Sequence, residues 1–353
     1  MNVLKRAFVD KSWQQMLREN AGQQQTMLCE RLLLQEKWKE SVKDPIPFFT
    51  EYLTEHPEQL FVLLSEAEYE FLCDIWDERV EEIEEDKNIL RNISALKKLG
   101  LVYYSRKESL LYVNEEAREH FYFYVMGRSA WEQVRKNQDL EYAVRGMLYQ
   151  CGIIPVESLY EILKRKNDEM TMSYEEFRQF LIGRIDLWQF LGIFRMIYED
   201  REYVECIDVK DRQKILKGRM MHPELSEYEP PTMRDAIHVG MAGGIGKWKG
   251  MDELLAFLAR ILGGEPEKNT TAIVVFAKNI LSYIQSGDSI KEINEKLTAK
   301  TDDFTEEESE ELERCLDLLY WNTPLHVRKG HSRNEGEEKD PERQFSVING
   351  GKK

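Results

Sequence analysis

Six basic side chains gather around one predicted helix and the β-hairpin that follows it, in a chain that is acidic overall. They are Lys87, Arg91, Lys97 and Lys98 on the helix and Arg106 and Lys107 at the tip of the hairpin. In DNA-binding proteins, a helix in this position enters the major groove and such a hairpin tip contacts phosphate. These six residues are therefore the candidate nucleic-acid-binding site of the chain.

The alternative interpretation of this basic segment is a solvated helix face with ordinary lysines. The acidic run at residues 81–86 adjoins the helix and weakens its positive field. The corresponding part of the second half of the chain carries Glu175, Glu176 and Asp186, with only Arg178 and Arg184 as cations. DNA binding is accordingly an alternative function and not the favoured one.

Two other segments have the residue types of a binding site but lack one required element. Residues 240–247 end in Gly-Ile-Gly-Lys, but Gly240 is one residue too far away for a phosphate-binding loop, and Trp248 replaces the hydroxyl residue. We interpret this segment as a loop before a helix that begins near Met251. His326 and His331 could hold a metal ion, yet no third ligand of the right type is close in the sequence.

The cysteines and histidines give no sign of catalysis. Cys29, Cys73, Cys151, Cys206 and Cys315 are widely spaced and form no C-x-x-C pair, so we expect free thiols that behave as small core residues. No arrangement of Ser, Cys and His has local support. The sequence predicts no catalytic residue, no metal ion and no cofactor.

Composition limits the classes of partner. The 353 residues carry a formal net charge of −16, with 42% hydrophobic and 32% charged residues. Such a charge repels nucleic acid on average and favours partners with basic surfaces. No apolar run is long enough to span a membrane, and the first residues lack the apolar stretch of a secretory signal. We therefore expect a cytoplasmic protein that does not contact a membrane.

One pattern occurs twice and predicts the architecture. A helix ends near Leu-Gly and is followed by a short apolar strand, a polar turn and a second strand, first at residues 95–113 and again at residues 188–207. We expect strands only in these two hairpins, near residues 101–113 and 194–207. A helix followed by such a two-stranded wing is how a winged-helix module ends. Tyr122, Phe123, Tyr124 and Trp131 are expected to pack the junction between the two modules.

The predicted fold is mainly α with small β-wings: tandem winged-helix-like modules plus a C-terminal helical domain. Its divisions are an N-terminal helical arm (1–57), module 1 (58–125), module 2 (126–215), a linker with three prolines (216–231), the C-terminal helical domain (232–330) and a disordered tail (331–353).

Two segments carry a family resemblance. They are CGIIPVESLY at residues 151–160, paired with YEEF at residues 174–177, and WNTP at residues 321–324 followed by KGHSRNE at residues 329–335. The chain resembles a group of uncharacterised bacterial proteins that often end in a SEC-C motif, which is a Cys-rich zinc knuckle. No cysteine follows Cys315, so the zinc knuckle itself is absent here. The resemblance implies organisation and no particular activity.

The favoured function is non-catalytic macromolecular recognition or assembly with a protein partner. One alternative is a DNA-binding transcriptional regulator that uses module 1. The other is an enzyme whose site forms only in three dimensions, since any of the histidines could meet a carboxylate in space.

Overall fold

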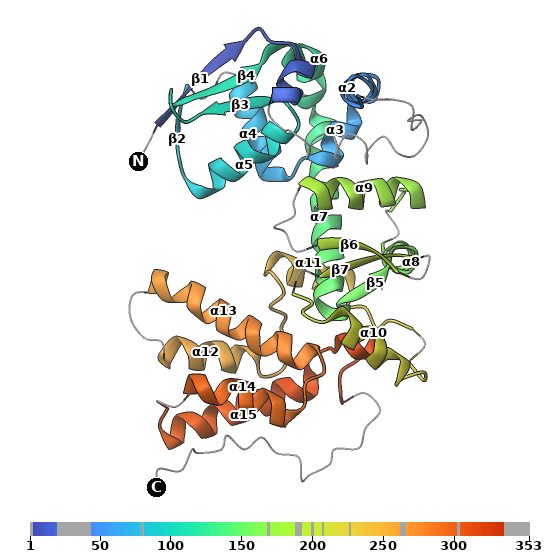
Figure 1. The fold of residues 1–353 in the computed structure, drawn as a ribbon, viewed down its shortest axis with the longest axis vertical. Helices are drawn as coiled ribbons and strands as arrows, with labels where there is room; N and C mark the ends of the chain where they lie inside the picture. Colours follow the sequence, from blue (N-terminus) through green and yellow to red (C-terminus); the bar gives the residue numbers. More distant parts are fainter. Residues whose placement is uncertain are drawn as a thin grey trace. The chain divides into compact units, whose positions relative to one another are not determined.

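The chain divides into two compact units in its computed structural model. Unit 1 comprises residues 1–141 and 172–191, and unit 2 comprises residues 142–171 and 192–353. The structure describes residues 3–19, 44–77, 79, 81–167, 170–187, 193–198, 201–206, 208–225, 227–261, 266–301 and 304–334. Both units are mainly helical, and each contains one small sheet among its described residues (Figure 1).

Unit 1 combines a four-stranded sheet with several helices. Besides a helical stretch at residues 13–19, its elements are β1 (Val3–Val9), α2 (Ile46–Glu55), α3 (Glu58–Leu63), α4 (Glu66–Trp76), β2 (Glu82–Glu84), α5 (Lys87–Lys98), β3 (Val102–Ser105), β4 (Leu110–Asn114), α6 (Glu115–Val125), the first part of α7 (Arg128–Cys151) and α9 (Tyr174–Leu187).

The sheet of unit 1 has the strand order β2-β1-β4-β3. β3 and β4 form the predicted antiparallel hairpin, whereas β1 pairs with β4 in parallel and with β2 in antiparallel orientation. The prediction of a helical arm over residues 1–57 is therefore wrong at its start. Residues 3–9 form a central strand because their backbone groups pair with segments about 80 and 105 residues away, which local periodicity does not reveal.

Side-chain caps define the helices of unit 1. A capping box at Ser65 and Glu68 begins α4, and the carboxylate of Asp86 accepts hydrogen bonds from the backbone N–H groups of Asn88 and Ile89 to begin α5. Gly100 ends α5 with φ +69°, and the N–H of Leu101 donates to the carbonyl of Leu96 across the helix end. These caps fix where α5 stops and the hairpin begins.

Unit 2 contains a three-stranded sheet and a group of C-terminal helices. Its elements are the end of α7, β5 (Ile153–Pro155), α8 (Val156–Lys166), β6 (Ile193–Tyr198), β7 (Arg201–Cys206), α10 (Arg212–Met220), α11 (Met233–Met241), α12 (Met251–Ile261), α13 (Pro266–Gln285), α14 (Ile290–Thr301), α15 (Glu306–Asn322) and the 3₁₀ helix η2 (His326–Arg328). The sheet order is β5-β7-β6. One apolar core joins the helices α12 to α15.

Both predicted hairpins are confirmed as antiparallel pairs, β3 with β4 and β6 with β7. The expectation that strands occur only there is wrong, because β1, β2 and β5 lie outside these segments. In each sheet a distant strand pairs with one hairpin strand. The second strand of an isolated hairpin leaves one hydrogen-bonding edge free. In unit 1 β1 pairs with this edge of β4, and in unit 2 β5 pairs with this edge of β7.

The prediction of a disordered tail over residues 331–353 is wrong for its first four residues. Residues 331–334 are packed into unit 2, with Arg333 only 8% exposed. Its guanidinium donates to the carbonyl oxygens of Tyr320 and Asp288 and lies 3.6 Å from the centroid of the Tyr320 ring. Residues 335–353 of the predicted tail lie outside the described residues.

Among the described residues, no helix has both the length and the apolar character needed to cross a bilayer.

Candidate functional site

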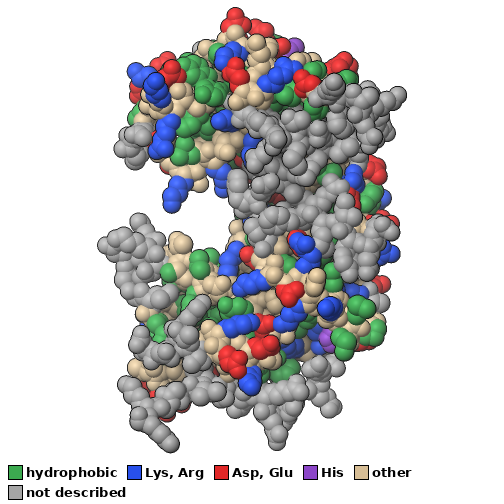
Figure 2. Space-filling view, viewed as in Figure 1, with side chains coloured by type: hydrophobic (Ala, Val, Ile, Leu, Met, Phe, Trp, Pro, Cys, Tyr) green, Lys and Arg blue, Asp and Glu red, His purple; other side chains and the backbone are tan. Residues whose placement is uncertain are grey.

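The structure places the six candidate basic residues on two neighbouring elements of unit 1. Lys87, Arg91, Lys97 and Lys98 lie on α5, and Arg106 and Lys107 lie in the turn between β3 and β4. Four of them are exposed, while Lys97 and Lys98 are half-buried. Figure 2 shows Lys and Arg side chains spread along the side of unit 1 that carries β2, α5 and the β3–β4 hairpin, interspersed with acidic and hydrophobic groups.

The strand register brings an aromatic pair next to these cations. Tyr103 of β3 and Tyr112 of β4 are direct cross-strand partners, with ring centroids 6.1 Å apart and ring planes 32° apart. The ammonium group of Lys97 lies 5.6 Å from the centroid of the Tyr103 ring. The hydroxyl of Tyr112 donates to the carboxylate of Glu108 at 3.1 Å. The basic end of α5 and the hairpin therefore share one surface.

This surface is part of one face of the sheet, and we call it the open face: Val3, Lys5, Ala7, Tyr103, Leu110 and Tyr112. Glu82 and Glu84 of β2 lie on the same side of the sheet, opposite Lys5 and Val3. Val3 is 40% exposed and Tyr103 is 38% exposed, and none of the six is buried. The opposite face is closed, because Leu4, Val102, Leu111 and Val113 are at most 1% exposed and belong to the core of unit 1. Sequence reasoning missed the open face because residues 3–9 were expected to be helical.

A second exposed surface lies on α6. Its outward side, which we call the α6 face, consists of Glu115, Glu116, Glu119, His120, Phe123 and Tyr124, all of them exposed. Phe123 is 85% exposed and Tyr124 is 55% exposed. The inward side, Ala117, Phe121 and Val125, is buried at 1% exposure or less. The α6 face thus combines three carboxylates with two accessible aromatic rings.

The expectation that Tyr122, Phe123, Tyr124 and Trp131 pack together at a junction is wrong for two of the four. Tyr122 and Trp131 are half-buried and pack against the core of unit 1. Phe123 and Tyr124 point away from it because the buried positions of α6 recur at residues 117, 121 and 125. A helical projection of residues 115–125 would have revealed this arrangement, since Phe123 falls between Glu116 and Glu119 and Tyr124 falls at the edge of the buried stripe.

A buried charged cluster joins α4, α7 and α9 inside unit 1. The guanidinium of Arg184 lies 3.4 Å from the carboxylate of Glu141 and donates to the carbonyl of Leu64 at 3.0 Å. Glu68 lies nearby, and burial raises the pKa of its carboxyl to about 7 despite the cap bonds from Ser65. All three charged side chains are at most 2% exposed, so they cannot meet a macromolecule. We assign this cluster a structural role.

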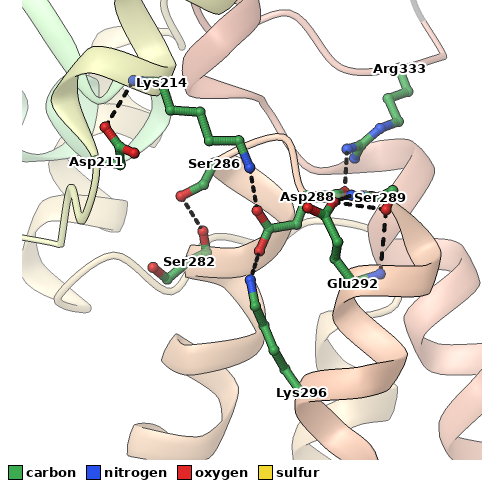
Figure 3. Close-up of polar contacts among 9 residues, drawn as sticks. All are labelled: Asp211, Lys214, Ser282, Ser286, Asp288, Ser289, Glu292, Lys296 and Arg333. Atoms are coloured by element: carbon green, nitrogen blue, oxygen red, sulfur yellow. Dashed lines mark hydrogen bonds and ion pairs between the residues drawn. The ribbon is translucent and has the colours of Figure 1, made fainter.

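In unit 2, Asp288 is the centre of an ion-pair cluster that links α10 to the turn between α13 and α14 (Figure 3). Its carboxylate accepts hydrogen bonds from Lys214 at 2.6 Å and from Lys296. Burial alone would raise the pKa of Asp288, but these two ammonium groups lower it below its usual range. Figure 3 also shows Arg333 donating to the Asp288 backbone and Glu292 closing a cap on Ser289. Asp288 is 4% exposed and paired on both sides, which marks the cluster as structural.

His326, one of the two histidines considered as metal ligands, is buried in unit 2 at 2% exposure. Its Nε2 lies 3.0 Å from the carbonyl oxygen of Tyr149 and donates to it. Burial lowers the pKa of His326 to about 4. Nearby, Arg219 donates to the carbonyl oxygens of His326 and Cys151 and to the hydroxyl of Tyr228. His331 instead lies 3.4 Å from the carbonyl oxygen of Glu227.

The glycine-rich segment forms a helix end and a turn, as expected. Gly240 lies inside α11, Gly243 and Gly244 have φ of +63° and +97°, and α12 begins at Met251. A search of the described residues finds no group of three or more His, Cys, Asp and Glu side chains arranged to hold a metal ion.

Comparison of the chain with protein-family models, with curated proteins and with solved structures finds no match.

Proposed function

We propose that this protein acts by non-catalytic recognition of a protein partner, and that the α6 face is its contact surface. The observation that carries this proposal is the exposure of Phe123 at 85% beside Tyr124 at 55%. A large aromatic ring costs free energy while it remains in water, and buried aromatic residues dominate the energies of protein interfaces. Exposed pairs of this kind mark interaction sites.

The charges around the two rings specify the kind of partner. Glu115, Glu116 and Glu119 lie on the outward side of α6, N-terminal to the two rings, and the chain as a whole carries a formal net charge of −16. We therefore propose a partner with an apolar pocket for the rings and a basic rim for the carboxylates. Complementary charge at the rim speeds association, while the rings provide most of the affinity.

The test is site-specific photocrosslinking of the intact chain in the cells that express it, with the photoreactive residue at position 120. His120 is exposed and lies between Phe123 and Glu119 on the α6 face. We expect a crosslinked protein whose yield falls by at least about tenfold when Phe123→Ala and Tyr124→Ala are combined, the loss that corresponds to a truncated interface hot spot. Glu119→Lys should also lower the yield.

The matched control places the photoreactive residue at position 90 on α5, where Leu90 is 39% exposed. That position should not yield the same product. A product at position 120 that is insensitive to the loss of both rings, or no product at all, would overturn the proposal.

Two finer statements about the fold belong to this proposal. We regard residues 58–125 as winged-helix-like, with support from α5 followed by the β3–β4 hairpin. The same pattern in residues 126–215 is divided between the units, because α9 belongs to unit 1 and the β6–β7 hairpin belongs to unit 2. We also propose that the chain is related to the uncharacterised bacterial proteins that often end in a SEC-C motif. Its support is that residues of both quoted segments, Gly152 and Cys151 in one and Gly330 in the other, lie together in unit 2.

Duplex DNA binding by α5 remains the second candidate function. Lys87 and Arg91 on α5 and Arg106 and Lys107 in the hairpin turn are exposed, which favours it. The exposed glutamates Glu82 and Glu84 on β2 oppose it. The duplex titration described next tests it directly.

A further inference from the structure

We propose that the open face of the unit 1 sheet is a binding site for single-stranded nucleic acid, with Tyr103 and Tyr112 as its stacking platform. The two rings are cross-strand partners with centroids 6.1 Å apart, and Tyr103 is 38% exposed. Unpaired bases stack on aromatic side chains that lie on a sheet surface, whereas the bases of a duplex are already stacked on one another. Paired rings on an open sheet therefore select a single strand over a duplex.

Cations surround this platform on the sides where phosphates would lie. The ammonium of Lys97 lies 5.6 Å from the Tyr103 ring centroid. Lys11 lies near both tyrosines, with its ammonium paired to Glu19 at 2.6 Å. Lys5 is exposed on β1 of the same face, and Arg106 and Lys107 are exposed at the end of the hairpin. A groove or surface that combines such cations with aromatic rings is the usual composition of a site for single strands.

The carboxylates near this face define the path of the bound strand. Glu82 and Glu84 lie on β2, at the far edge of the sheet from β3, and the register places Glu82 opposite Lys5. Glu19 pairs with Lys11, and the carboxylate of Glu108 accepts a hydrogen bond from the hydroxyl of Tyr112. The positive side is therefore the side of β3 and the end of α5. We place the phosphate chain along β3 and the hairpin turn, and not across β2.

Shape supports the same occupant. The open face belongs to a sheet of short strands, with four residues in β3 and five in β4. The two rings can stack two bases, and the cations beside them can contact the phosphates that flank those bases. This predicts a short binding site, weak in comparison with multi-ring single-strand binders, and sensitive to salt.

The experiment titrates the intact chain into a fluorescein-labelled 12-nucleotide oligothymidylate and, in parallel, into a labelled 12-base-pair duplex, with fluorescence anisotropy as the readout. We expect saturable binding of the single strand and weaker binding of the duplex. Tyr103→Ala should weaken single-strand binding about 5- to 150-fold, which is the measured range for loss of one stacking partner. Tyr103→Phe should retain it, since phenylalanine stacks without a hydroxyl.

Lys97→Ala should reduce the slope of log affinity against log salt by about 0.7, because one phosphate contact of a single strand is lost. Phe48→Ala is the matched control, because it removes an exposed ring of unit 1 on α2, outside both the open face and the α6 face, and should leave single-strand binding unchanged. Circular dichroism of each variant checks that it folds. Tighter binding of the duplex, an equal loss from Phe48→Ala, or no saturable binding of the single strand with a Kd below about 100 µM, the weak end of the ordinary range for non-specific binding, would overturn the proposal.

Discussion

Gly152 and His326 are 174 positions apart in the sequence, yet a Cβ atom added to Gly152 would lie 2.5 Å from Cγ of His326. Gly152 also has φ +77°, a backbone conformation that side chains other than glycine rarely adopt. The N–H of Gly152 donates to the carbonyl of Leu148 at 2.7 Å, which ends α7. One glycine therefore ends a long helix and leaves room for a buried histidine.

Gly152→Ala should destabilise unit 2 by about 2–5 kcal/mol. About 1–2 kcal/mol comes from the left-handed backbone and a further 1–3 kcal/mol from overpacking against the imidazole. Gly243→Ala is the control, because Gly243 also has a positive φ, of +63°, but an added Cβ would meet only the end of the Lys278 side chain at 3.6 Å. Gly243→Ala should lose only the stability that comes from the left-handed backbone conformation, about 1–2 kcal/mol. Urea unfolding followed by circular dichroism measures both, and equal losses would refute the contact with His326.

The elements that the sequence predicted correctly are those whose signals are local. The apolar, turn, apolar patterns predicted β3 with β4 and β6 with β7. The Ser-x-x-Glu pattern of residues 65–68 is a local signal of the same kind, and α4 begins there at Glu66. β1 was missed because a strand with the sequence Val-Leu-Lys-Arg-Ala-Phe-Val becomes a central strand only through β2 and β4, which are distant in the chain.

The same limit applies to the candidate sites. The basic residues of α5 could be found from their types alone, but their proximity to Tyr103 and Tyr112 depends on the register of the hairpin. The role of His326 was equally hidden. Its neighbours Tyr149, Cys151 and Gly152 come from a segment about 175 residues earlier, and nothing in the local sequence indicates that they enclose it.

Glu68→Gln should make unit 1 more stable at alkaline pH. Burial raises the pKa of Glu68 from 4.5 to about 7, so the folded state holds the proton more tightly than the unfolded state. The wild-type chain therefore loses stability as the pH rises from about 4.5 through 7, by at most about 1.4 kcal/mol per pH unit. The glutamine variant lacks this loss, because it stays neutral and can still accept the Ser65 N–H bond.

Urea unfolding at pH 5, 6, 7 and 8 measures the free energy of unfolding of the wild-type chain and of the Glu68→Gln variant. The stability of the variant relative to the wild type should increase as the pH rises. Glu308→Gln is the control, since Glu308 occupies the same position of a capping box at the start of α15 but is only half-buried there. The cap bonds from Thr305 lower the pKa of Glu308, so its substitution should bring no gain at alkaline pH. If the stability difference between Glu68→Gln and the wild type is the same at every pH, the raised pKa of Glu68 is contradicted.

Acid should destabilise unit 2 through His326. Burial lowers the pKa of this imidazole from 6.5 to about 4, so the unfolded chain takes up the proton first as the pH falls. The stability that the neutral imidazole contributes is complete above pH 6.5 and is lost as the pH falls from 6.5 towards 4, with a slope of at most about 1.4 kcal/mol per pH unit. His326→Gln removes this titration, and its amide N–H can still donate to the Tyr149 carbonyl.

Thermal unfolding between pH 7 and pH 4.5 compares the wild-type chain, His326→Gln and His120→Gln, the last being a substitution at an exposed histidine. The variant at position 326 is expected to be less stable than the wild type at pH 7, since glutamine fills the buried site less well, and to lose less stability on acidification. His120→Gln should follow the wild-type curve. If all three curves fall in parallel, His326 is not the group whose protonation limits the stability of unit 2 in acid.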